Sequence, residues 1–173
     1  QEIYRKGWNE KMGAFTQCYG NDDMDASNLL MANYGFIDPK DPMFVSTVEK
    51  TQEELSLNGL MYRYKNKDDF GMPSSAFTVC SFWLVKALCQ TGKRKEAVEL
   101  FENLLEHGNH LGLFSEDMNF KSKRLLGNFP QSYSHLSLID AATALNGMSV
   151  DENEAILNRI DHAHEKRETE VSQ

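Results

Sequence analysis

The sequence predicts a single all-α domain, and two observations support that prediction. Apolar residues recur at intervals of three and four in several long segments, which is the spacing of one face of an α-helix. Strand-like material is confined to short runs at 60 to 64 and 123 to 127. A chain of 173 residues can build one domain with its own core and is too short for two ordinary domains.

Two helices are predicted in the N-terminal half. The first is short and covers Asp25 to Asn33, with Asp25 as its N-cap, because a carboxylate can accept hydrogen bonds from the exposed amides of a first turn. The second begins at Asp41-Pro42, where proline suits the first turn of a helix. Its expected buried face contains Phe44, Val48 and Leu55.

A helical hairpin is predicted in the middle of the chain, over 75 to 91 and 93 to 107. The link at Thr91-Gly92-Lys93 is short, so the two helices should be antiparallel. Trp83 falls on the apolar face of the first helix and is expected in the core. The other apolar positions of the pair are Phe77, Cys80, Phe82, Leu84, Val85, Leu88, Val98, Phe101, Leu104 and Leu105.

The last predicted helix runs from Pro130 to about Leu145 and stops at Asn146-Gly147. Beyond it the chain is highly charged and has no apolar stripe after Ile160. This composition predicts a marginal helix from Asp151 to about Arg167 and a frayed end. The expected domain is therefore 1–148, followed by a charged tail at 149–173.

The composition excludes several functional classes. A formal net charge of -8 argues against a nucleic-acid surface, which needs a basic patch. No apolar run approaches the roughly 20 residues of a membrane helix. No signal-like segment opens the chain, but Gln1 leads into interior-looking sequence, so we expect the biological start to lie upstream and leave the compartment open. The three cysteines, Cys18, Cys80 and Cys89, lack metal-type spacing and are expected to be small core residues.

Glu116 is the candidate site residue that the local sequence singles out. Taken alone it is a solvated loop acid, and His135 is a packed helix histidine. Glycines mark turns on both sides of Glu116, at Gly108, Gly112 and Gly127. The aromatic residues that we expect to wall a cleft beside it are Phe114, Phe120, Phe129 and Tyr133. A carboxylate among aromatic faces suits a carbohydrate, because sugar rings offer apolar faces to stack on and hydroxyls to bond.

Several motifs in order carry a family resemblance. The segment "GLFSEDMNFKSKRLLGNFPQSYSHLSLIDAA", with "GWNEKMGAFTQCYGNDDMDASNLL", "STVEKTQEELSLNGLMYRY" and "AFTVCSFWLVKAL" upstream, resembles the C-terminal part of the glucoamylase and trehalase group, glycoside hydrolase family 15. The likeness runs from about Gly7 to Gly147. It implies an (α/α)6 toroid of six outer and six inner helices with its active site at one end. This chain would supply the C-terminal helices, and the missing N-terminal part of the same domain would be its partner.

The resemblance also implies a reaction, the hydrolysis of α-glucosidic bonds with inversion by two carboxyl groups about 6.5–9.5 Å apart. The family's general base lies in a motif that matches "LFSED", which assigns this role to Glu116. Asp117 is the neighbouring alternative, and its side chain is expected to point elsewhere. The general acid lies in a tryptophan-glutamate motif upstream of "GWN", so this chain should lack it and be inactive alone. The expected substrate is a glucan or a disaccharide such as trehalose.

The resemblance assigns supporting roles with no cofactor and no metal. The residues expected to line the site or orient Glu116 are Gln131, Tyr133 and His135, and those expected to wall the cleft are Trp8, Asn9 and Tyr19. Glu116, Trp8 and Tyr133 should then share one end of the helices, in a partly exposed cleft. Where many relatives have an acidic residue before "AF", this sequence has Ser74 and Ser75, which predicts a lost substrate contact or an altered preference.

A helical-repeat module of the tetratricopeptide kind is the alternative, as a non-catalytic protein-interaction domain. The hairpin positions that suit it are Trp83, Ala87, Leu88, Gly92, Ala97 and Phe101. Such a solenoid needs about three similar repeats. Only one such hairpin is visible in the sequence, which favours the glycosidase interpretation.

Overall fold

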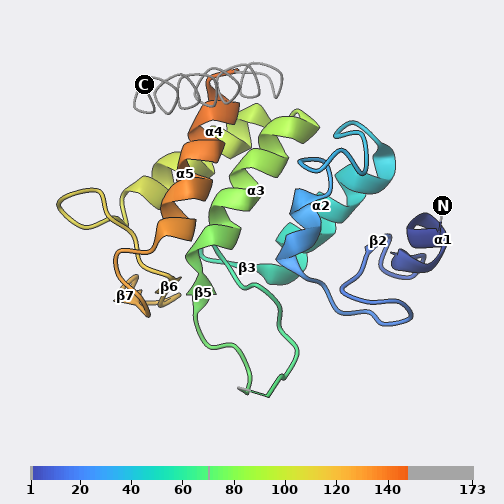
Figure 1. The fold of residues 1–173 in the computed structure, drawn as a ribbon, viewed down its shortest axis with the longest axis horizontal. Helices are drawn as coiled ribbons and strands as arrows, with labels where there is room; N and C mark the ends of the chain where they lie inside the picture. The colour runs from blue at the N-terminus through green and yellow to red at the C-terminus, as the bar shows by residue number, and fades with distance from the viewer. Residues whose placement is uncertain (1, 70, 148–173) are drawn as a thin grey trace, which may run out of the picture.

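The computed structural model describes residues 2–69 and 71–147, and in this part of the chain the fold is mainly helical, as predicted (Figure 1). The helices are α1 (Glu2–Gly7), the 3-10 helix η1 (Ala26–Leu30), α2 (Pro42–Leu55), α3 (Thr78–Thr91), α4 (Arg94–Leu105) and α5 (Ser132–Leu145). The strands are two residues long each: β1 (Trp8–Asn9), β2 (Ala14–Phe15), β3 (Ser56–Leu57), β4 (Leu60–Met61), β5 (Ala76–Phe77), β6 (Asp117–Met118) and β7 (Leu125–Leu126).

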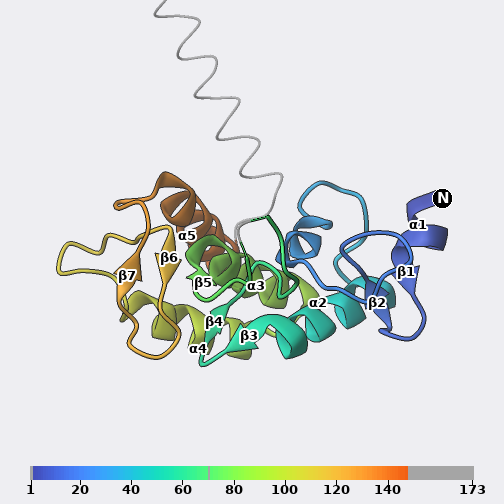
Figure 2. The same cartoon turned by 90° about the horizontal axis from the view of Figure 1, so that it is seen from below.

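Helix α3 is the centre of the bundle, packed between α4 and α5 (Figure 2). The predicted hairpin with α4 is present, and Gly92 ends α3 in the left-handed region at φ 95°. Helix α5 lies parallel to α3. Lys86 pairs with Asp140 at 2.7 Å, and three residues later Cys89 Sγ donates to the Ala144 carbonyl at 3.3 Å. The N-terminal ends of α3 and α5 therefore lie side by side at one end of the bundle.

The two N-terminal helices begin where the sequence predicts. The Asp41 carboxylate accepts from Met43 N–H at 2.8 Å, and the Asp25 carboxylate accepts from Ser27 N–H at 2.7 Å. The segment after Asp25 is nevertheless a 3-10 helix that ends at Leu30, not a helix to Asn33. The prediction was too long because Asn28 is drawn toward β2, where its side-chain amide donates to the Phe15 carbonyl at 2.9 Å.

A small sheet shortens the predicted helix at 75 to 91. Residues 76 and 77 form β5, the edge strand of a three-stranded antiparallel sheet in the order β5-β6-β7. In its register Phe77 faces Asp117, and Asp117 faces Leu126. Backbone pairing with a strand some 40 residues away in sequence overrides the local helical period there. The sheet brings the Glu116 segment to the N terminus of α3.

Four of the expected burial patterns were wrong. Phe114 and Phe120 are 1% and 7% exposed, so they belong to the core and not to a cleft wall. Phe114 meets the Phe82 ring edge-on at 5.5 Å, which explains its burial. Trp83 is only partly buried, because it lines a pocket formed by α3, α5 and the segment at the end of η1. Cys18 is exposed in the turn after β2, whereas Cys80 is buried as expected.

The predicted tail at 149–173, with its helix over 151 to 167, lies outside the described residues. Within residues 2–69 and 71–147, no helix has the length and apolar character required to span a membrane.

Candidate functional site

The backbone of Glu116 is fixed on two sides. Its N–H donates to the Asn128 carbonyl at 2.9 Å, and its carbonyl accepts from Thr78 N–H, also at 2.9 Å. Thr78 is the first residue of α3, and Asn128 follows β7. Glu116 therefore lies directly before β6, between the start of the central helix and the loop that leads to α5.

The Glu116 carboxylate is held through one oxygen. Oε2 accepts from the backbone N–H of Asn128 at 3.2 Å and from its side-chain Nδ2 at 2.9 Å. Gly127 lies against the same oxygen, since a Cβ atom built at this glycine would be 2.9 Å from Oε2. The φ of Gly127 is +74°, a conformation that residues with a side chain rarely adopt. The backbone thus approaches the carboxylate as closely as glycine permits.

Helix α5 supports the residues immediately before Glu116. The buried Ser134 hydroxyl donates to the Ser115 carbonyl at 2.8 Å, and Gln131 N–H donates to the Phe114 carbonyl at 2.9 Å. Phe114 N–H in turn donates to His135 Nε2 at 3.3 Å, while His135 Nδ1 is 2.7 Å from the Gln131 carbonyl. An imidazole that accepts at Nε2 and donates at Nδ1 is neutral, with its proton on Nδ1. His135 and Gln131 therefore contact the backbone next to Glu116.

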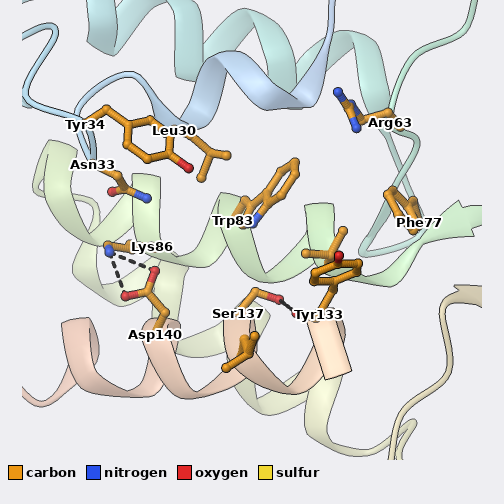
Figure 3. A pocket seen from close by; sticks show the side chains of 12 residues that line it. Leu30, Asn33, Tyr34, Arg63, Phe77, Trp83, Lys86, Tyr133, Ser137 and Asp140 are labelled. Carbon is orange, nitrogen blue, oxygen red and sulfur yellow. Dashed lines mark hydrogen bonds and ion pairs between the residues drawn. The ribbon is translucent and has the colours of Figure 1, made fainter. Parts of the chain in front are cut away.

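Two pockets adjoin at this end of the bundle. We call the first the carboxylate pocket; it has a volume of about 680 Å³ and is lined by Arg63, Tyr64, Asp68, Gly71, Met72, Pro73, Ser75, Phe77, Glu116 and Asp117. The second, the aromatic pocket, has about 570 Å³ and is lined by Leu30, Asn33, Tyr34, Arg63, Phe77, Val79, Trp83, Lys86, Tyr133, Leu136, Ser137 and Asp140 (Figure 3). Because Arg63 and Phe77 line both pockets, the two form a continuous surface.

Arg63 is a site residue that sequence reasoning missed. Its Nε donates to Asp25 Oδ1 at 2.8 Å, and its guanidinium carbon is 5.9 Å from the Trp83 ring. The salt bridge and the indole hold the guanidinium at the junction of the two pockets. The available signal was an arginine inside the otherwise apolar and aromatic run "LMYRY".

Asp117 also lines the carboxylate pocket, whereas the sequence predicted that its side chain would point elsewhere. The difference arises from Ser75, whose hydroxyl donates to Asp117 Oδ2 at 2.6 Å from the residue before β5. Burial raises the pKa of the Asp117 carboxyl; the Ser75 hydrogen bond opposes this, and the charge of Glu116 adds to it. Of the Ser74-Ser75 pair, the second serine is thus in direct contact with Asp117.

The structure brings some of the predicted site residues together and separates others. Tyr133 is 65% exposed and lines the aromatic pocket, at the same end of the bundle as Glu116. The N-terminal residues lie elsewhere: Trp8 packs on Phe15 at 5.4 Å, and Tyr19 is exposed with Lys6 above its ring at 5.9 Å. Neither pocket is lined by Trp8, Asn9 or Tyr19.

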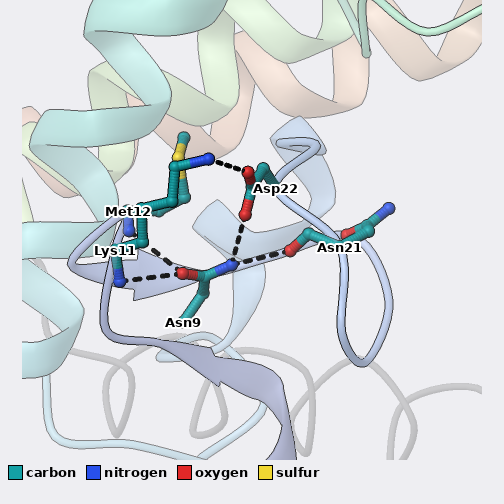
Figure 4. A network of polar contacts seen from close by, with 5 residues as sticks. All are labelled: Asn9, Lys11, Met12, Asn21 and Asp22. Carbon is teal, nitrogen blue, oxygen red and sulfur yellow. Dashed lines mark hydrogen bonds and ion pairs between the residues drawn. The ribbon is translucent and has the colours of Figure 1, made fainter.

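Asn9 is occupied by its own loop (Figure 4). Its Nδ2 donates to the Asn21 carbonyl and to Asp22 Oδ1, both at 2.8 Å. Its Oδ1 accepts from the backbone N–H groups of Lys11 and Met12 at 2.9 Å and 3.1 Å. Lys11 also pairs with Asp22. All of these contacts lie within the first quarter of the sequence.

Among the described residues, no group of three or more His, Cys, Asp or Glu side chains has an arrangement that could hold a metal ion. The polar chemistry of the two pockets is that of carboxylates, one guanidinium, one ammonium, one carboxamide and hydroxyls, beside aromatic rings.

Comparison with known proteins relates this chain to a family. A trehalase from Thermoplasma volcanium is 36% identical over 160 residues, which are 92% of this chain and 25% of the relative. A trehalase from Mycobacterium tuberculosis is 42% identical over 135 residues, 76% of this chain and 20% of the relative. The chain thus spans between a fifth and a quarter of the length of these relatives.

Solved structures share the fold. A wild-type glycosidase superposes with a TM-score of 0.70 at 17% identity, covering 83% of this chain and 41% of that one. A glycosidase variant in complex with glucose gives a TM-score of 0.69 at 16% identity. At this level of identity the likeness shows the fold, which is part of the helical toroid of these glycosidases. Residues 1–143 match the profile of glycosyl hydrolases family 15, and the chain therefore belongs to that family.

Proposed function

We propose that this chain is the C-terminal part of the catalytic domain of an inverting α-glucosidase-like hydrolase and that Glu116 is its general base. The observation that carries the proposal is a partly exposed carboxylate in a pocket, held through one oxygen, in a chain of glycosyl hydrolases family 15. We infer a trehalose-type disaccharide or a glucan as substrate. The relatives named trehalase support the first of these.

In the proposed reaction, Glu116 takes a proton from a water molecule. The water oxygen attacks the anomeric carbon on the face opposite the leaving oxygen, and the glycosidic C–O bond breaks. The leaving oxygen receives its proton from a general acid in the part of the domain that we propose to precede this chain. The product sugar then has the inverted configuration.

The adjoining pockets suit the binding of a sugar. Tyr133, Trp83 and Phe77 provide aromatic surface against which the apolar face of a sugar ring can pack. Arg63 offers guanidinium donors to hydroxyl oxygens at the junction with the carboxylate pocket. The proposed placement of the reacting bond is therefore near Arg63, with Glu116 on one side.

Substitution of Glu116 by glutamine tests the proposal. In the full-length enzyme, E116Q should lower kcat for trehalose or maltose by at least about 10²–10⁴-fold, because it removes the base. Glu102→Gln on the exposed face of α4 is the matched control and should leave kcat unchanged. The 173-residue chain alone should show no Glu116-dependent hydrolysis of either sugar.

The outcomes are distinct. A full-length E116Q enzyme with the parent kcat would show that Glu116 is not the base. Turnover by the isolated chain that depends on Glu116 would show that the general acid lies within it. With trehalose as substrate, NMR of the first products should detect β-glucose from the attacked ring and an equal amount of α-glucose from the leaving ring, whereas initial release of α-glucose alone would exclude inversion.

A further inference from the structure

The two oxygens of the Glu116 carboxylate have different surroundings. Oε2 receives two N–H groups, both from Asn128, at 3.2 Å and 2.9 Å. Within residues 2–69 and 71–147, no hydrogen bond to Oε1 is formed. A carboxylate oxygen has two lone pairs, so the two donors occupy the acceptor capacity of Oε2. Oε1 is the oxygen with capacity to spare.

We propose that Asn128 is a positioning residue that assigns proton acceptance to Oε1 of Glu116. The proposal rests on the role of Glu116 as general base. Without the two donors the carboxylate can turn about its terminal bond and exchange its oxygens, since such torsions are broad and roughly two-fold. With them, Oε2 is fixed and Oε1 keeps a constant direction, in a side chain that lines the carboxylate pocket. The proton of the attacking water is then transferred to Oε1.

Asn128 is itself fixed by the residue that it holds. Its carbonyl accepts from Glu116 N–H at 2.9 Å, so three hydrogen bonds join these two residues. Gly127 completes the arrangement, because its missing side chain leaves room for Oε2. Residues 127 and 128 therefore both lie against Oε2 of the carboxylate.

The proposed role requires an asparagine side chain at position 128. Alanine keeps the backbone donor at 3.2 Å and loses the shorter contact of 2.9 Å. Aspartate places a second carboxylate oxygen against Oε2, so Glu116 must turn away or change partner. Glutamine keeps the amide but is one methylene longer. Only asparagine provides both donors at the observed spacing.

The first test is spectroscopic and uses the full-length enzyme without any substrate. In ¹⁵N-labelled protein, the backbone and side-chain amide signals of Asn128 should shift with pH as Glu116 titrates, and this dependence should vanish in E116Q. The amide of Gly112 serves as an internal reference outside the network. Asn128 signals that do not follow Glu116 would overturn the proposal, whatever the activity of the enzyme.

The second test measures kinetics in the full-length enzyme. Asn128→Ala should lower kcat by about 10–10²-fold with little change in KM, because a misplaced base loses rate and not substrate binding. Asn128→Asp should lower kcat further. Asn146, beyond the C-terminal end of α5, is the control, and N146A and N146D should retain the parent kcat. An Asn128→Ala enzyme with the parent kcat, or with a change in KM alone, would refute the proposal.

The third test uses a pair of glycines with the same backbone conformation. Gly127 and Gly112 have φ of +74° and +73°, so alanine strains the backbone similarly at both. A Cβ atom at Gly112 meets nothing within 4 Å, whereas one at Gly127 collides with Oε2. Both variants should lose stability in urea unfolding, Gly127→Ala more than Gly112→Ala because of the added collision with Glu116, and only Gly127→Ala should lose kcat. Equal kcat in the two variants would contradict the proposed positioning of Oε2.

These experiments distinguish the role of Glu116 as general base from the role of Asn128 as positioning residue. If E116Q is as active as the parent, the assignment of the base fails. If E116Q is inactive and Asn128→Ala is fully active, the base stands and only the role of Asn128 fails.

Discussion

Two loops of this protein are organised around an asparagine, and they use it differently. Asn9 contacts only its own loop, and its amide makes four hydrogen bonds with partners up to 13 residues away. Asn128 bonds to Glu116, whose segment also contacts the starts of α3 and α5. The first loop is stabilised by itself and the second by the helical bundle. The Asn9 amide uses all of its donors and acceptors to hold its loop, whereas Glu116 keeps Oε1 available as a hydrogen-bond acceptor.

The largest expected effects come from the cores beneath the two loops. Phe15 and Phe114 are each 1% exposed, and replacing either by alanine should cost about 3–5 kcal/mol of unfolding free energy. Phe114→Ala should also abolish the pH dependence of the Asn128 amide signals that comes from Glu116. The reason is that Phe114 contacts Phe82 and His135, which support the segment before Glu116. Urea unfolding and amide NMR measure both quantities. Loss of that pH dependence in Phe15→Ala would show that the two loops are not independent.

Asn9→Ala should have an intermediate effect. It removes four hydrogen bonds that are exposed or partly buried, each of which typically contributes about 0.5–1.5 kcal/mol. The Asn128 signals should be unchanged, since none of the Asn9 contacts reaches Glu116. In the full-length enzyme, an unchanged KM is expected if Asn9 only holds its loop. A raised KM at unchanged stability would instead favour the substrate contact that the family resemblance implies.

The smallest effects should appear in the pH dependence of stability, with opposite signs in the two loops. The Lys11 and Asn9 hydrogen bonds lower the pKa of Asp22 in the folded state. The ionised carboxylate therefore stabilises the fold at pH values above its ordinary pKa of 3.8, and this stabilisation is lost as the pH falls through the pKa of the folded state. Burial raises the pKa of Asp117 in the folded state. The protonated carboxyl therefore stabilises the fold at pH values below 3.8, and this stabilisation is lost as the pH rises through the pKa of the folded state.

Asp22→Asn and Asp117→Asn isolate these contributions. The stability of the parent minus that of the variant should rise with pH for Asp22 and fall with pH for Asp117, as measured by urea unfolding from pH 2 to pH 7. If both stability differences changed with pH in the same direction, the pKa values of Asp22 and Asp117 would not be shifted in opposite directions, contrary to the structure.

The helical elements were largely predictable because their signals are local. Asp41 and Pro42 mark the start of α2, and Gly92 ends α3, through contacts that lie within one turn of helix. The start of α3 was misplaced because β5 depends on pairing with β6, and no residue near Ala76 reports a partner about 40 residues away. The length of η1 failed for the same reason, since Asn28 bonds to β2.

The candidate site was predictable only in part. The glycines and the family motif single out Glu116, and Gly127 does lie against it. Asn128 was missed because the sequence does not show which asparagine will bond to Glu116, and Arg63 was missed because its partner Asp25 lies 38 residues away in sequence. The roles of Trp8, Asn9, Tyr19, Gln131, Tyr133 and His135 in binding stay predictions. Their positions differ nonetheless: Tyr133 lines a pocket that adjoins the one at Glu116, and the three N-terminal residues line neither.

The parallel packing of α3 and α5 has an electrostatic consequence. Peptide dipoles in each helix sum to about half a positive charge at its N terminus. Parallel helices place these two ends together, and the N-cap of α3, Phe77, provides no side-chain oxygen to satisfy the first amides. The positive ends lie where Glu116 and Asp117 are neighbours, and they offset part of the repulsion between the two acids. In a protein with a net charge of -8, backbone amides thus add partial positive charge beside the acidic pair, where Arg63 is also found.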